Sequence, residues 1–185
     1  DAHFRELDVQ ILDEPLLVKS VRGVVAVPPG TLADMLRTHG DWAPDLLDLV
    51  ACLTAPGDVI VQQSPGVGYL TVGLATLATV IALADEDESW LRTNVLLTKS
   101  DRVRFGPPPD AANVLVATDL SVPAPRMLLL GEHVQPPANS RQLRLQVRHE
   151  PYHNHLTGEP VMSTRSPLPA VLALAAHDPL CEDLL

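Results

Sequence analysis

The alternation of short apolar runs with longer helical repeats, in the middle of the chain, is the feature that most constrains the fold. Residues 58–61 form a short and almost wholly apolar run, as a strand buried on both faces does. A glycine-containing loop follows, and then apolar residues at helical spacing. The order repeats, so strands are expected at 58–61, 79–83, 103–105 and 113–117, and helices at 67–78 and 85–98. Strand–helix–strand units at this spacing predict an α/β fold with a mostly parallel sheet.

Weaker patterns flank this centre. The other expected elements are a hairpin at 16–28, helices from Thr31 to His39 and from Pro44 to Pro56, strands at 127–130 and 143–147, and a short helix at 171–176. We therefore expect a lead-in of hairpin and helices over residues 1–55 and an α/β core over residues 56–185.

Composition and charge narrow the class of protein. The chain has 185 residues, of which 46% are hydrophobic, enough for one domain with a sizeable core. Its formal net charge is −10, so general nucleic-acid binding is not expected. No apolar run reaches the roughly 18 residues of a membrane span, and the sequence has no signal-type start. We expect no membrane partner and a cytoplasmic location.

Several motifs occur in a fixed order around the glycine loop. They are Pro56-Gly57-Asp58-Val59-Ile60-Val61, Gly68-Tyr69-Leu70-Thr71, Val80-Ile81-Ala82-Leu83 and Leu91-Arg92-Thr93-Asn94-Val95. Over about residues 30–105 this series resembles the FkbM-type family of S-adenosylmethionine-dependent methyltransferases. The resemblance implies a Rossmann-like methyltransferase fold, a three-layer α/β/α sandwich, preceded here by the small hairpin and helices. It also implies a cofactor site where the strand runs through the glycine turn into a helix.

The sequence departs from the family's pattern where the cofactor would be held. Gln62 stands in place of an aspartate at the strand end, and Ser64 replaces the first glycine of the loop. Ala84 stands in place of a glutamate that would accept both ribose hydroxyls. Each of those two hydrogen bonds would be worth roughly 1.5–3 kcal/mol, so their loss argues against ordinary cofactor binding.

A few residues would still face a ligand in this fold. These candidates for cofactor binding are Gln62, Ser64, Gly66, Gly68, Asp85 and Asp119. Asp85 follows Ala84, but a shift of one residue along a strand turns the side chain to the other face. Asp119 follows a strand and either faces the pocket or caps its loop. Gln62 and Gln63 either hold a polar ligand or tie the loop to its neighbours.

Two further groups of residues have alternative readings. The three histidines of the segment His149–His155 could bind zinc or iron, or lie in an exposed polar loop. We expect the loop and no metal site, because Pro151 prevents a helical presentation of His149 and His153. Cys52 lies in an apolar run, where a buried free thiol is expected.

These observations support two main hypotheses. The first is a non-catalytic methyltransferase-like domain, a scaffold or partner-binding module in a biosynthetic protein or complex, with no cofactor and no catalytic residue expected. The second is a divergent but active O-methyltransferase that uses S-adenosylmethionine on the hydroxyl of a sugar or small molecule. A third, a metal-binding domain, depends on the His149–His155 segment.

Overall fold

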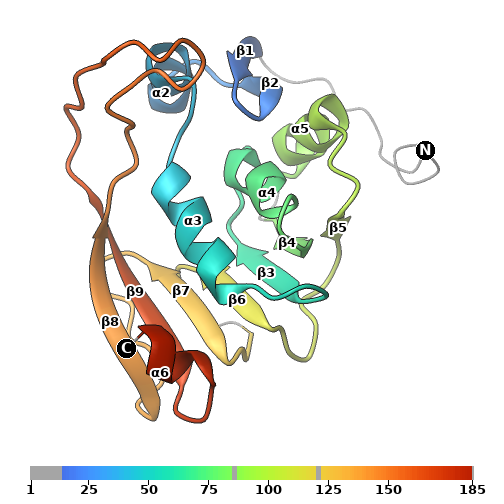
Figure 1. The fold of residues 1–185 in the computed structure, drawn as a ribbon. Helices are drawn as coiled ribbons and strands as arrows, with labels where there is room; N and C mark the ends of the chain where they lie inside the picture. The colour runs from blue at the N-terminus through green and yellow to red at the C-terminus, as the bar shows by residue number, and fades with distance from the viewer. Residues whose placement is uncertain (1–13, 85–86, 120–121, 185) are drawn as a thin grey trace.

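The computed structural model describes residues 14–84, 87–119 and 122–184 (Figure 1). Its elements are β1 (Leu16–Ser20), β2 (Gly23–Val27), α2 (Thr31–His39), α3 (Pro44–Leu53), β3 (Val59–Gln63), α4 (Tyr69–Leu74), β4 (Thr79–Leu83), α5 (Ser89–Thr98), β5 (Val103–Phe105), β6 (Val114–Ala117), β7 (Arg126–Leu130), β8 (Ser140–Val147), β9 (Leu168–Ala175) and α6 (Leu180–Leu184).

A seven-stranded sheet forms the centre of the molecule, in the order β5-β4-β3-β6-β7-β9-β8. All strands run parallel except β9, which is antiparallel to both of its neighbours. The strand β3 lies between β4 and β6, and Val61 pairs with Ile81 on one side and Leu115 on the other. The hairpin of β1 and β2 is a separate two-stranded sheet. The predicted Rossmann-like α/β fold with a mostly parallel sheet is confirmed.

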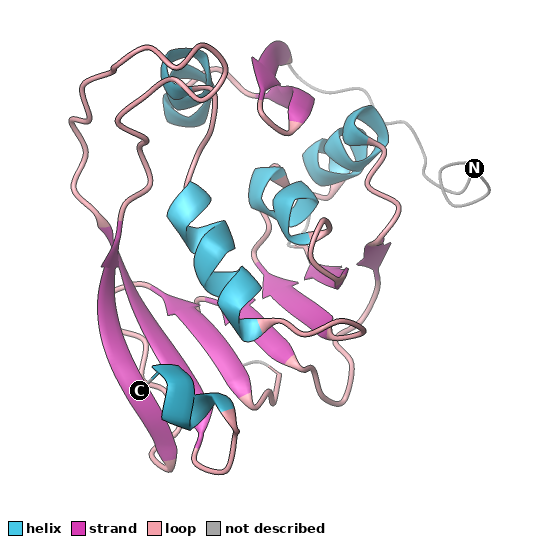
Figure 2. Cartoon of the chain, in the orientation of Figure 1, coloured by secondary structure: helices cyan, strands magenta, loops and turns pink. Residues whose placement is uncertain are grey.

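The helices α3, α4, α5 and α6 lie on one face of the sheet (Figures 1 and 2). The larger core is packed there: Leu46 and Val50 of α3, Leu74 of α4 and Leu91 of α5 are fully buried against the strands. A strand alternates its side chains between the two faces, so neighbouring residues belong to different cores.

The opposite face of the sheet is covered differently. Its buried residues come from strands and connections: Val61, Ala112, Leu115, Ala117, Val122, Ala124, Met127, Leu129, Val171 and Ala173. In the described parts of the connections β5–β6, β6–β7 and β7–β8 there is no helix. Where the sandwich expected from the resemblance has its second helical layer, this chain has loops rich in proline, which has no backbone N–H to donate.

Most of the expected elements are present, and three expectations need correction. Residues 171–176 are not a helix; they lie in β9, whose Leu172 and Val171 are buried on opposite faces of the sheet. A strand buried on both faces shows the continuous apolar run that was taken for a helix. The helix expected over 67–78 is shorter, as α4 ends at Leu74. The helix expected from Asp85 begins at Ser89.

Two smaller differences concern the surface and the C-terminal end. Cys52 is exposed rather than buried, because α3 turns Val50 and Leu53 toward the core and Cys52 away from it. The helix α6 was not expected. No helix in the described residues is long and apolar enough to cross a membrane.

Candidate functional site

The glycine loop leaves the carboxyl end of β3 with an unusual backbone. Ser64 (φ 49°), Gly66 (φ 56°) and Gly68 (φ 86°) are all in the left-handed region. Glycine adopts this conformation freely, whereas for Ser64 it costs roughly 1–2 kcal/mol. The turn closes with a 3.0 Å hydrogen bond from the Gly68 N–H to the Pro65 carbonyl.

The two glycines of this loop have different surroundings. A Cβ atom on Gly68 would lie 2.4 Å from Cδ1 of Leu91, so α5 packs directly on the backbone there. A Cβ atom on Gly66 would meet no atom within 4 Å. Gly68 therefore serves helix packing, and Gly66 borders open space.

A cavity of about 390 Å³ opens beside the loop. It is bounded by the loop, the ends of β3 and β6, the helix α2 and Trp42. Its lining residues are Thr31, Leu32, Met35, Trp42, Gln62, Gln63, Ser64, Pro65, Gly66, Val67, Tyr69, Leu70, Val116, Ala117, Thr118 and Leu130. Because the chain leaves β3 and β6 in different directions, this is the topological switch point, where ligands bind in open α/β sheets.

The chemistry of this cavity is largely apolar. Among the residues that the structure describes, none that lines the cavity carries a charge. Gln62 is buried, with an exposed fraction of 4%, and its Oε1 atom has no hydrogen-bond partner. Gln63 differs: its Oε1 accepts hydrogen bonds from the backbone N–H groups of Thr118 (3.2 Å) and Asp119 (3.1 Å). The loop-tying role suggested for both glutamines thus belongs to Gln63.

The predicted site residues are only partly brought together. Gln62, Ser64 and Gly66 line the cavity, whereas Gly68 is not in the lining and packs against Leu91 of α5. Asp119 is exposed and is not part of the lining. Asp85 lies outside the described residues.

Asn94 of α5 holds the loop to the N-terminal hairpin. This fully buried side chain accepts a hydrogen bond from the Ala26 N–H (2.7 Å) and donates to the carbonyls of Ala26 (2.7 Å) and Val67 (2.8 Å). One amide therefore satisfies three backbone groups of two segments. The family resemblance pointed to Asn94, although not to these partners.

An arginine whose side chain is buried beside the cavity was not predicted from the sequence. Arg22, in the turn of the hairpin, donates to the carbonyls of Tyr69 (2.7 Å) and Trp42 (3.3 Å), and its guanidinium lies 4.3 Å from the centre of the Tyr69 ring. The Tyr69 hydroxyl donates to Asp41 at 2.7 Å. Burial raises the pKa of Tyr69 above its ordinary value, against the opposing effect of Arg22. A turn arginine is usually solvated, so no local pattern indicates this burial.

The long connection between β8 and β9 reaches α2 (Figure 1), where it is held by Glu150. This buried carboxylate accepts hydrogen bonds from the backbone N–H groups of Thr164 and Arg165, and His39 lies 3.8 Å away. Burial alone would raise the pKa of Glu150. The hydrogen bonds, including one from the Ser163 hydroxyl, and His39 outweigh it and lower that pKa.

The three histidines of this connection do not converge. His155 lies 3.3 Å from Asp41, His153 forms an isolated bridge with Pro160, and Nε2 of His149 is buried without a partner. Burial lowers the pKa of His149. Among the described residues, no group of three or more histidine, cysteine or acidic side chains could hold a metal ion.

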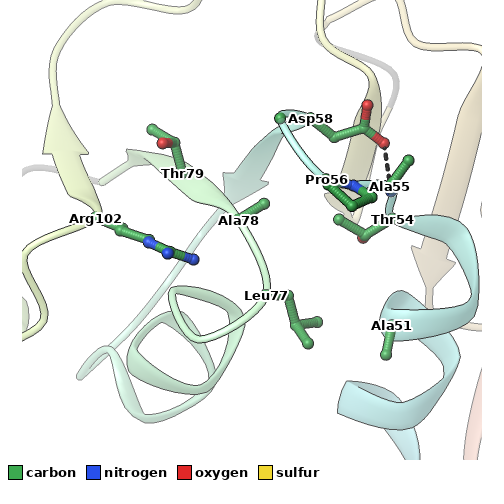
Figure 3. A pocket seen from close by; sticks show the side chains of 10 residues that line it. Ala51, Thr54, Ala55, Pro56, Asp58, Leu77, Ala78, Thr79 and Arg102 are labelled. Atoms are coloured by element: carbon green, nitrogen blue, oxygen red, sulfur yellow. Dashed lines mark hydrogen bonds between the residues drawn. The ribbon is translucent and has the colours of Figure 1, made fainter.

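A second cavity, of about 440 Å³, lies at the opposite, amino-terminal edge of the strands (Figure 3). Arg102 and Thr79 line one side and Asp58 the other. The Asp58 carboxylate accepts a hydrogen bond from the Ala55 N–H (2.8 Å) and pairs with Arg126 (3.3 Å). Asp58 therefore fixes the entry into β3, on the side where this fold does not bind ligands.

Comparison with known proteins supports the fold. No protein-family model and no curated protein matches the sequence. The chain is similar to a Pyrococcus horikoshii protein described as a transferase, with a TM-score of 0.54 and 14% identity, over 88% of this chain and 72% of that one. TYW2 of M. jannaschii in complex with AdoMet gives a TM-score of 0.53 and 10% identity, over 89% and 87%.

A third solved structure, the SAM-dependent methyltransferase from Agrobacterium tumefaciens, has a TM-score of 0.50 and 9% identity, over 89% of this chain and 71% of that one. At these identities the likeness concerns the fold alone. The chain has the Rossmann-like fold of S-adenosylmethionine-dependent methyltransferases.

Proposed function

We propose that this chain is a methyltransferase-like domain that does not transfer methyl groups and serves as a scaffold or partner-binding module in a biosynthetic protein or complex. The observation that carries the proposal is that no described residue lining the switch-point cavity is charged. The proposal includes two expectations from the sequence: that the chain is related to the FkbM-type family, and that the protein is located in the cytoplasm.

The cavity and the cofactor do not fit each other chemically. S-adenosylmethionine carries a sulfonium, an ammonium and a carboxylate. Moving such charges from water into an apolar cavity costs several kcal/mol unless each finds a partner. Gln62 supplies a neutral amide where the family has an aspartate, and Asp119 lies outside the lining.

The binding role is supported by the other face of the sheet. The connections after β5, β6 and β7 are short, and in their described parts loops lie where a helical layer would cover the strands. These loops already bury the inner strands, so a protein partner or a flanking domain would pack on the loops, in the place of the second helical layer.

Titration calorimetry of the full chain with S-adenosylmethionine and S-adenosylhomocysteine tests the proposal. We expect no heat of binding at micromolar concentrations of either compound. Binding with a micromolar dissociation constant would contradict the proposal.

The retained cavity favours one other candidate function, a divergent O-methyltransferase active on the hydroxyl of a sugar or small molecule. TYW2, whose fold the chain shares, was solved in complex with AdoMet. In this version Asp85 or Asp119 replaces the missing acids. It requires measurable S-adenosylmethionine binding that is lost in Asp85→Ala or Asp119→Ala, and an unchanged affinity in both variants would exclude it.

A further inference from the structure

We infer that the switch-point cavity binds an uncharged, mainly apolar ring compound that donates a hydrogen bond to Oε1 of Gln62. This inference deepens the proposed function and rests on it in one respect, the absence of charge among the described residues that line the cavity. The ligand class is thus a neutral ring compound with one hydrogen-bond donor.

The side chain of Gln62 has an unpaired acceptor. Gln62 is 4% exposed, lines the cavity, and has no partner for Oε1. A buried polar atom without a hydrogen bond costs about 1–3 kcal/mol, so proteins pair almost all such atoms. A donor on a bound ligand would supply the missing partner.

The size and polarity of the cavity suit a small neutral compound. A volume of about 390 Å³ lies within the range of small-molecule sites, roughly 300–1,000 Å³. Leu32, Met35, Val116 and Leu130 give it apolar walls, and Trp42 offers an aromatic one. Apolar walls with a few placed polar groups are typical of sites for neutral ring compounds.

The two neighbouring glutamines at the end of β3 differ in their hydrogen bonds. Oε1 of Gln63 accepts hydrogen bonds from the backbone N–H groups of Thr118 and Asp119, so Gln63 holds the end of β6 in place. Gln62, one residue earlier, points to the other face of β3, and its buried Oε1 has no hydrogen-bond partner. The two glutamines therefore have different roles: Gln63 stabilises the cavity wall, and Gln62 is the proposed contact for a ligand.

The experiment compares two probes of nearly equal size, indole and 1-methylindole, by protein-observed NMR titration of the full chain. Both are neutral and apolar, but only indole has an N–H donor. We expect indole to bind about fivefold more tightly, as one neutral hydrogen bond allows. In Gln62→Met, which removes the acceptor at similar volume, the two probes should bind equally.

Gln63→Met is the matched control. It also lines the cavity, but its acceptor is already used, so the preference for indole should remain about fivefold. The variants should also differ in thermal stability without ligand. Gln62→Met should melt at a higher temperature than the native chain, because it removes an unpaired acceptor, and Gln63→Met at a lower one.

Two results would overturn the inference: equal affinity of the native chain for both probes, including no binding of either, or a lower melting temperature for Gln62→Met. The probe comparison uses the native chain, so it decides even if a variant does not fold. Failure here leaves the calorimetric result with S-adenosylmethionine unaffected. Conversely, micromolar S-adenosylmethionine binding would contradict the proposed function whatever the indole titration shows.

Discussion

At the scale of single residues, the two glycines of the loop have different roles: Gly68 allows α5 to pack on the loop, and Gly66 borders the cavity. Gly68→Ala should lower the free energy of unfolding by about 3 kcal/mol, since the left-handed backbone and the contact with Leu91 both oppose a Cβ atom. Gly66→Ala has only the backbone cost, about 1 kcal/mol. Urea denaturation measures both values. Equal losses would show that Leu91 does not constrain Gly68.

The amide of Asn94 should be one of the most costly side chains to lose. Asn94→Leu keeps the volume but leaves the buried N–H of Ala26 and the carbonyl of Val67 without partners, a cost of about 2–4 kcal/mol. The exposed Asn113 accepts a hydrogen bond from the Val59 N–H and provides the control. Asn113→Leu should cost less than about 1 kcal/mol by the same chemical denaturation, because water can replace its bond. A similar cost for both would contradict the role of Asn94.

The sequence pointed to several residues around the cavity but not to their contacts, and a ligand-binding role for them stays a prediction. The order of motifs pointed to Gln62, Gly66, Gly68 and Asn94, because each sits in a short pattern tied to a strand end or a helix face. The burial of Arg22 could not be predicted in this way. It depends on Tyr69 and Trp42, which are distant in sequence and form no local pattern with Arg22.

At the scale of elements, the hairpin is joined to α4 through a contact that leaves no room for a side chain. A Cβ atom on Gly73 would lie 2.4 Å from Nη1 of Arg22. Gly73→Ala should therefore cost about 2 kcal/mol in the native chain. In an Arg22→Ala background the same change should stabilise by up to about 1 kcal/mol, as the helix propensity of alanine predicts. A double-mutant cycle measures the coupling, and additive effects would contradict the contact.

The β8–β9 connection should loosen in acid. The pKa of Glu150 is lowered in the folded state, so its stabilisation is present above the unfolded-state value and is lost as the pH falls through the folded-state value. The pKa of His149 is also lowered from its ordinary value of 6.5. Its contribution to the free energy of unfolding is therefore lost at a higher pH than that of Glu150 when the solution is acidified. Both changes have the same sign: the connection is most stable near neutral pH.

Urea unfolding at several pH values tests this expectation. Glu150→Gln should lose about 2–4 kcal/mol at pH 7, as for a buried charged acceptor, and the gap to the native chain should close in acid. Glu88 is a control, because its pair with Arg92 is partly exposed. Glu88→Gln should change little at any pH. A gap for Glu150→Gln that did not depend on pH would contradict this account.

Local patterns explain which elements could be predicted. The hairpin, α2, β3 and β4 carry turn residues, caps or apolar runs that depend only on neighbouring residues. The strand β9 was mistaken for a helix because its apolar run, buried on both faces, has no alternation. What makes it a strand is its pairing with β7 and β8, which no short window of sequence contains.

At the scale of the whole molecule, the sequence predicted a parallel α/β fold but not the way its second face is covered. Pro107-Pro108-Pro109, Pro123 and Pro125 stand in connections where helices were implied by the family resemblance. Proline disfavours a helix interior, and this physical sign was present in the sequence. The loops cover the inner strands through small side chains such as Ala112 and Ala124.

The whole chain should unfold as one unit, because the lead-in and the core expected from the sequence form one compact domain. The contacts of Arg22 with Tyr69 and of Ala26 with Asn94 cross the boundary near residue 55, and their polar groups are largely buried. Scanning calorimetry should show one transition with equal calorimetric and van't Hoff enthalpies. Two resolved transitions would show that the lead-in is a separate folding unit.

The position of the cavity across β3 and β6 also has a kinetic consequence. These two strands pair only after the chain has passed through β4 and β5, so their contact closes a long loop and is expected to form slowly. The cavity exists only once that pairing is complete. A compound that binds there would therefore bind folded chains and not partly folded ones. It would slow the unfolding of the folded chains. It would also protect newly made protein against degradation, in proportion to the concentration of the compound.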